Sequence, residues 1–113
     1  MTTTTTVRAM KIATLNDTFR TTGQGGRIVV TRGVADKGDD FLAAAVRAVQ
    51  TFSAFEEGDD PYREHDFGAV TVQGNELFWK IDYYDKALEY GSDDPADPAK
   101  TTRVLTIMLS DEY

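Results

Sequence analysis

The segment from Leu77 to Tyr84 places the strongest constraint on what this chain can fold into. Its residues alternate in character along the segment, and a period of two is typical of a strand that buries one face. We therefore expect one face of this strand to turn toward the core and the other to turn away from it. The predicted core face carries Leu77, Trp79, Ile81 and Tyr83, and the opposite face carries Phe78, Lys80, Asp82 and Tyr84.

Two further strands are expected in the chain. The run Phe67–Val72 precedes the alternating segment, and the residues at 73–76 between them fit a short hairpin connection. The β-branched run at Ile28–Thr31 predicts another strand nearer the N-terminus.

Three helices are expected where apolar residues recur at helical spacing. The first runs from Val7 to about Thr22 and stops at the glycine-rich turn 23–26. The second follows the capping residues Asp39 and Asp40 and carries an apolar stripe at Leu42, Ala45, Val46, Val49 and Phe52. The third runs from Ala99 to about Asp111, behind a start signal at Asp97-Pro98.

This order of elements, α-β-α-β-β-α, predicts an α+β fold. We expect a small, mainly antiparallel sheet with about three helices packed against it. The chain has 113 residues, which suits one domain, so a single domain is expected over residues 7–113. The threonine-rich residues 1–6 predict a disordered tail.

Composition excludes several classes of protein. The sequence contains no cysteine, which rules out disulfides, thiol nucleophiles and thiolate metal sites. No run approaches the length of about 18 apolar residues that a membrane span requires. The threonine-rich start does not resemble a secretory signal peptide. Together these features predict a cytoplasmic protein that does not enter a membrane.

The net charge of −7 is distributed unevenly along the chain. Residues 1–52 hold seven Lys and Arg against four Asp and Glu, whereas residues 53–113 hold five against fifteen. Because such a chain repels polyphosphate, direct binding of nucleic acid or of an anionic membrane is not expected. The acidic half favours a basic partner, although solubility alone also accounts for acidity of this size.

Two acidic segments with nearby tyrosines are the predicted partner-binding residues. They comprise Glu56, Glu57, Asp59, Asp60 and Tyr62 in one segment, and Tyr90, Asp93 and Asp94 in the other. Carboxylates spaced along a surface can imitate the phosphates of DNA, and an exposed tyrosine suits an interface anchor. We therefore expect a non-enzymatic protein that binds a basic nucleic-acid-binding protein or complex and occludes its nucleic-acid site.

An alternative site centres on the single histidine of the chain. Glu64, His65 and Asp66, with Asp82 and Asp85 from the next strand, offer the oxygen and imidazole ligands of a small metal-binding or hydrolytic site. The same segment can equally hydrogen-bond its own loop, because neighbours along a strand point to alternate faces. No cofactor is expected, since the glycines at 23–26 follow a helix rather than a strand.

Six stretches of the sequence carry a family resemblance: Asn16–Arg20, Gly23–Val34, Asp60–Gly68, Phe78–Asp85, Gly91–Pro98 and Arg103–Tyr113. Together they resemble a bacterial family of unknown function, DUF3768. The chain departs from the family pattern at Arg63, where glycine or a small residue is expected in a tight turn. The resemblance implies a short protein common on plasmids and other mobile elements, with no assigned activity. In that setting the expected partner is a host restriction or CRISPR nuclease.

Overall fold

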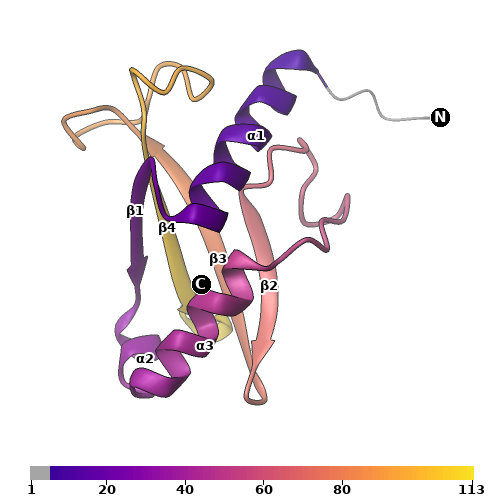
Figure 1. Ribbon diagram of the computed structural model, residues 1–113, viewed down its shortest axis with the longest axis vertical. Coiled ribbons are helices and arrows are strands. Elements are labelled where there is room, and N and C mark those ends of the chain that lie inside the picture. The colour runs from indigo at the N-terminus through magenta and orange to yellow at the C-terminus, as the bar shows by residue number, and fades with distance from the viewer. Residues whose placement is uncertain (1–5) are drawn as a thin grey trace.

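A four-stranded sheet with helices on one face forms the framework of the protein (Figure 1). The computed structural model describes residues 6–113, so most of the predicted tail lies outside the described residues. The elements are α1 (Val7–Thr22), β1 (Gly26–Val30), α2 (Arg32–Ala35), α3 (Asp39–Gln50), β2 (Phe67–Val72), β3 (Asn75–Tyr84), β4 (Thr102–Leu109) and the 3₁₀ helix η1 (Ser110–Glu112). The predicted α+β class is confirmed.

The strands lie in the order β1-β4-β3-β2. β2 pairs antiparallel with β3 and β3 with β4, whereas β1 pairs parallel with β4. The hairpin between β2 and β3 turns on Gln73 and Gly74 alone, whose φ angles of 50° and 80° suit a two-residue turn that matches the strand twist. The connection is thus shorter than the predicted 73–76, because β3 already begins at Asn75.

Both ends of α1 are set by local capping. The Thr6 hydroxyl accepts a hydrogen bond from the amide of Ala9, which satisfies one of the free N–H groups of the first turn. Gly23 adopts a left-handed φ of 76°, and its amide donates to the carbonyl of Phe19. The helix therefore ends at the predicted residue, Thr22.

The core lies between the helices and one face of the sheet. Leu77, Trp79 and Ile81 are almost fully buried there, which confirms the predicted core face of β3. The indole of Trp79 packs edge-on against Phe52, with ring centroids 5.5 Å apart. Gly68, its pairing partner on β2, makes room for the indole, because a Cβ atom there would lie 2.5 Å from Nε1.

The stripe that α3 buries is rotated slightly from the predicted one. Phe41, Ala45 and Val49 are buried, whereas Leu42 and Val46 are only partly covered. All five side chains still pack against the core. The spacing therefore predicted the helix and its buried side, and docking on the sheet decided which residues lie at the centre of that side.

The predicted last helix, Ala99 to about Asp111, is wrong, because residues 102–109 form the strand β4. Asp97 begins a turn by accepting a hydrogen bond from the amide of Ala99 at 2.9 Å, but no helix follows. β4 buries Leu105 on one face and Met108 on the other, so its apolar pattern does not distinguish strand from helix. Pairing with β3 and β1 on its two sides decides its conformation.

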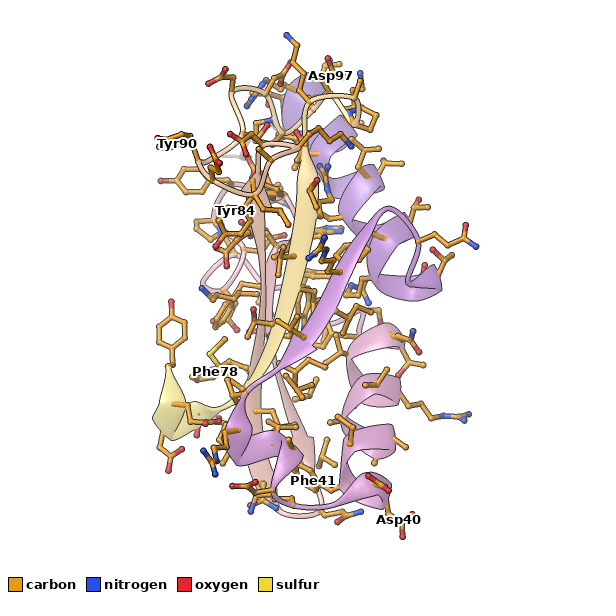
Figure 2. All side chains as sticks on the ribbon, turned by 90° about the vertical axis from the view of Figure 1, so that its left-hand side faces the viewer. Asp40, Phe41, Phe78, Tyr84, Tyr90 and Asp97 are labelled. Carbon is orange, nitrogen blue, oxygen red and sulfur yellow. The ribbon has the colours of Figure 1, made fainter. Side chains whose placement is uncertain are left out.

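Within the described residues, the face of the sheet opposite α1 and α3 is left open except at one end, where the 3₁₀ helix η1 lies (Figure 2). Phe78 and Tyr84 of β3 lie on this open face, as the alternation predicts. Beyond β4, the chain turns back over one end of the face. There Tyr113 packs edge-on against Phe78 and Phe67, with ring centroids 5.5 and 5.8 Å away.

The carboxylate of Glu112 fastens this C-terminal turn to the end of β1. It accepts hydrogen bonds from the hydroxyl of Thr31 at 2.6 Å and from the amides of Leu109 and Gly33 at 2.8 and 3.1 Å. The hydrogen bond from Thr31, followed by that from Leu109, lowers the pKa of Glu112. A carboxylate is thus placed beside β1 on the open face.

Replacing Trp79 by alanine should lower the free energy of unfolding by about 3–5 kcal/mol. The truncation removes buried apolar surface and leaves a cavity, which typically costs about 3–5 kcal/mol, against a total stability of about 5–15 kcal/mol. Urea unfolding followed by circular dichroism measures this loss. The matched control is Tyr84→Ala on the open face, for which we expect a loss of about 1 kcal/mol. Equal losses would show that the buried face of β3 is assigned incorrectly.

Candidate functional site

An open hollow lies between α1 and the loop 51–66, which connects α3 to β2 (Figure 1). Its volume is about 360 Å³. α1 contributes Met10, Ala13, Thr14 and Asp17, and the loop contributes Phe55, Glu56, Glu57, Asp60, Arg63 and His65. Acidic residues at four positions, Asp17, Glu56, Glu57 and Asp60, therefore border one space, which we call the acidic hollow.

The imidazole of His65 is held from several sides in the acidic hollow. Its Nδ1 atom lies 3.0 Å from both carboxylate oxygens of Asp17, and its Nε2 atom lies 3.7 Å from Oδ2 of Asp60. The ring stacks on Phe55, with centroids 3.8 Å apart and planes 3° from parallel. Nδ1 is thus within hydrogen-bonding distance of the Asp17 carboxylate, whereas the distance from Nε2 to Asp60 exceeds that of a hydrogen bond.

The backbone of the loop adopts left-handed conformations to reach this arrangement. Arg63 and His65 have φ angles of 58° and 57°. Asp60, which is only 4% exposed, accepts a hydrogen bond from the amide of His65 at 3.0 Å through its side chain. Its carbonyl accepts another from the amide of Arg63 at 3.1 Å. A tight turn thus forms at Arg63, where the resemblance led us to expect glycine or a small residue.

A buried arginine, Arg20, contacts two of the residues that border the acidic hollow. Arg20 is 3% exposed, and its guanidinium donates to the carbonyls of Val49 and Phe52 at 2.8 and 2.9 Å. The same group donates to Oδ1 of Asp17 at 3.2 Å. Its carbon atom also lies 5.4 Å from the ring centre of Phe55. Arg20 thereby fixes both the carboxylate and the aromatic ring that hold His65.

A second buried polar network centres on Asn16 of α1. The Asn16 amide group donates to the hydroxyl of Tyr83 at 2.8 Å and to the carbonyl of Glu64 at 2.9 Å, and it accepts from Arg103 at 2.6 Å. The Tyr83 hydroxyl donates to the Glu64 carboxylate at 3.2 Å. Burial is the main cause that raises the pKa of Tyr83 and lowers that of Arg103. This network ties α1 to β3 and β4.

The five residues of the alternative metal site do not converge on one point, although Asp66 and Asp82 border a common hollow. Glu64 binds Tyr83, and His65 faces Asp17 and Asp60, as described above. Asp82 forms an ion pair with Lys80 at 2.9 Å, and Asp85 accepts from the amide of Glu89 at 3.0 Å. Across residues 6–113, no group of three or more His, Asp or Glu side chains is placed to hold a metal ion. The alternative therefore lacks geometric support.

Asp66 is the acid of this segment whose titration is most altered. Its pKa is raised from 3.8 to about 6, mainly by burial and then by the charge of Glu64, with smaller contributions from Asp60 and Asp82. Asp66 borders a second hollow of about 370 Å³ together with Asp59, Lys80 and Asp82. Lys80, which is paired with Asp82, is a basic residue on the border of that hollow.

The predicted partner-binding residues divide between two places. Glu56, Glu57 and Asp60 border the acidic hollow, whereas Tyr90, Asp93 and Asp94 belong to the loop 85–101. α1 runs between the two loops (Figure 1), and its Arg8 pairs with Asp94 at 3.3 Å. Tyr62 and Tyr90 are 78% and 73% exposed, as an interface anchor would require. Asp60 is buried, so it shapes the loop rather than the outer surface.

Asp17, Phe55 and Arg20 are site residues that were not predicted from the sequence. Arg20 is buried on α1 and Asp17 is partly exposed there, and the docking of α1 against the loop brings Asp17 to His65 and Arg20 to Phe55. One signal was present: Asn16 stands at helical spacing from Ile12 and Phe19, within an otherwise apolar stripe. A polar residue at such a position indicates a buried hydrogen-bonding network.

Fold and site together define a small α+β protein with an acid-lined surface hollow. Residues 30–112 match the family model described as "Protein of unknown function (DUF3768)", and the chain belongs to this family. Comparison with curated proteins and with solved structures gives no match. Within residues 6–113, no helix is both long enough and apolar enough to cross a membrane.

Replacing Asp66 by asparagine should stabilise the protein at neutral pH. Because the folded-state pKa is raised to about 6, the folded state binds the proton more tightly than the unfolded state does. Stability from this group is therefore complete below about pH 3.8 and is lost as the pH rises through 6. Asp66→Asn should raise the free energy of unfolding by about 1 kcal/mol at pH 7, a value that allows for solvent screening.

The same variant should match the wild type near pH 4, where Asp66 is protonated in the folded state. Urea unfolding at both pH values measures the difference. Glu76→Gln, at an exposed position of β3, is the control and should show no gain at either pH. A gain for Asp66→Asn that is the same at pH 4 and pH 7 would contradict the assignment.

Replacing Arg63 by glycine should also stabilise the protein. Arg63 has a left-handed φ, which is sterically unfavourable for a residue with a Cβ atom and not for glycine. Glycine also increases the conformational entropy of the unfolded chain, which lowers stability, but we expect the relief of backbone strain to be the larger effect. We expect an increase of about 0.5–1 kcal/mol in the free energy of unfolding, measured by urea denaturation. The control is Tyr62→Gly in the same loop, which has no positive φ and should be destabilised.

Proposed function

We propose that the protein is a non-enzymatic interaction protein whose acidic hollow binds a basic side chain of a nucleic-acid-binding protein. The observation that carries this proposal is the convergence of Asp17, Glu56, Glu57 and Asp60 around one open space. Lysine and arginine side chains present only donors, which complements a wall of carboxylate acceptors.

The exposed acids around the hollow support the same partner chemistry. Glu56 and Asp59 are exposed on the loop, and Tyr62 stands beside them with most of its surface free. Acidic groups of this kind steer a basic partner at long range, and a tyrosine supplies apolar contact after docking. The loop 51–66 therefore offers both the charge and the anchor that the proposal requires.

The loop 85–101 is proposed as a second contact on the other side of α1. Tyr90 and Asp93 are exposed there, and Asp94 is held by Arg8 in an ion pair that is about half exposed. A surface ion pair of this type contributes about 0–1 kcal/mol, so a cation of the partner can replace Arg8 at little cost. The two loops would then contact the partner around the N-terminal half of α1.

In its narrower form, the proposal names the partner as a host restriction or CRISPR nuclease in the cytoplasm. Such enzymes bind nucleic acid in basic grooves, and an acidic protein that occupies the groove as a DNA mimic excludes the nucleic acid. The protein would then act as an anti-restriction or anti-CRISPR inhibitor of a mobile genetic element. The acidic residues themselves support the basic groove as the target, and the family resemblance suggests the biological setting.

A plasmid-establishment assay tests the narrower form. Bacteria with an active restriction or CRISPR system are transformed with a targeted plasmid, with and without expression of the protein. We expect the wild type to raise the yield of transformants at least about tenfold, and the double variant Glu56→Lys, Glu57→Lys to lose this effect, because it reverses the charge of two exposed acids that border the acidic hollow. Asp60 is left intact, since it is buried in the loop.

The matched control is the double variant Glu76→Lys, Asp111→Lys, which makes the same change in net charge at exposed positions outside the acidic hollow. It should retain full activity. Capture of a partner on immobilised protein should also weaken as salt rises, because exposed charges are screened. Equal activity of the two double variants, or capture that is indifferent to salt, would contradict the proposal.

A further inference from the structure

β1 is an edge strand whose outer side is open. It pairs with β4 on one side only, and Figure 2 looks onto its free edge, with no other element in front of it. The amide of Thr31, at the end of β1, donates to the carbonyl of Ile107 on β4. Because residues alternate, the backbone N–H and C=O groups of Ile28 and Val30 point away from the sheet. Such an edge is a template for pairing with another strand.

β1 is short and carries one charged side chain, Arg27, but it lacks other features by which edge strands avoid pairing. Its sequence, GRIVV, contains no proline and no acidic residue, and its pairing with β4 runs without a bulge. Val29 is 42% exposed on the open face, and it is the one strand residue among the exposed large apolar side chains of residues 6–113. β2, at the other edge of the sheet, has no such residue.

The surface beside Val29 is also apolar. A shallow hollow of about 310 Å³ on the open face is bordered by Val29, Val104, Leu88, Tyr84 and Arg27. These side chains come from three neighbouring strands and the loop after β3. The apolar surface at the free edge therefore continues inward across the sheet.

We propose that two copies of the chain pair antiparallel along β1, with Val29 of both copies at the two-fold axis. In this register, Ile28 of one copy lies opposite Val30 of the other, and each such pair exchanges both of its backbone hydrogen bonds. The two Val29 side chains contact each other on the open face. The two four-stranded sheets become one continuous sheet, and the interface is closed by symmetry.

Charge complementarity favours a second copy as the occupant. In the proposed register, Arg27 of one copy lies beside Thr31 of the other, on the same face. The Thr31 hydroxyl donates to the Glu112 carboxylate of its own copy, so the Arg27 guanidinium of the other copy lies near a negative charge. Arg27 is exposed and makes no ion pair with any residue of 6–113. The two-fold symmetry forms this contact twice, and it does not place the two Arg27 side chains opposite each other.

Sedimentation velocity of the full chain tests the proposal. Between about 1 and 300 µM, the wild type should show a monomer–dimer equilibrium. Val29→Lys places two ammonium groups against each other at the axis, and Arg27→Glu sets a carboxylate against Glu112, so each should weaken dimerisation at least about tenfold. The control Thr71→Lys, at an exposed position of β2, should leave the equilibrium unchanged. Circular dichroism confirms that each variant is folded.

Cross-linking gives an independent measurement, because the chain has no cysteine of its own. Opposite residues of a non-hydrogen-bonded antiparallel pair lie close enough for a disulfide, so Val29→Cys should form a covalent dimer under mild oxidation. Thr71→Cys should not. A wild type that stays monomeric over the whole range, a dimer that survives Val29→Lys, or a dimer lost on Thr71→Lys would each overturn the proposal.

Discussion

The buried guanidinium of Arg20 is the contact on which the rest of the site depends. The last carbonyls of a helix lack partners within the helix, and Arg20 of α1 donates to the carbonyls of Val49 and Gln50 at the end of α3 and to that of Phe52 just beyond it. This interaction docks the two helices and sets where the loop 51–66 begins. The same group holds Asp17 and lies over Phe55, the two residues that position His65. A buried charge of this kind is tolerated because its two terminal nitrogens donate to three carbonyls and a carboxylate, although its Nε atom has no hydrogen-bond partner.

The parts of the fold that were predictable are those that local chemistry decides. The alternation in β3, the threonine and glycine caps of α1 and the glycine turn before Asn75 each specify a conformation within a few residues. β4 was not predictable in this way, because Leu105 and Met108 are buried on opposite faces. Its conformation follows from its place between β1 and β3, which lie far from each other in sequence.

The acidic site was predictable in charge but not in geometry. The run of acids at 56–60 indicated a loop that attracts cations, and Glu56 and Asp59 are indeed exposed. Sequence could not show that Asp60 turns inward to bind the amide of His65, nor that Asp17 arrives from α1. Part of the formal charge of this half of the chain is thus committed to holding the loop in shape. The outer surface is correspondingly less acidic than the residue count suggests.

The central position of β4 also governs how the chain can acquire its structure during synthesis. β1 pairs with β4 and with no other strand, so the N-terminal part of the sheet has no partner until Leu109 has been made. The parallel pairing of Gly26–Val30 with residues 103–107 closes a long loop, and contacts of such sequence separation form slowly. In a nascent chain, α1, β1 and α3 are therefore synthesised before β4, the strand with which β1 pairs. In that interval the short apolar run of β1 depends on the surrounding polar residues, or on a chaperone, to stay unaggregated.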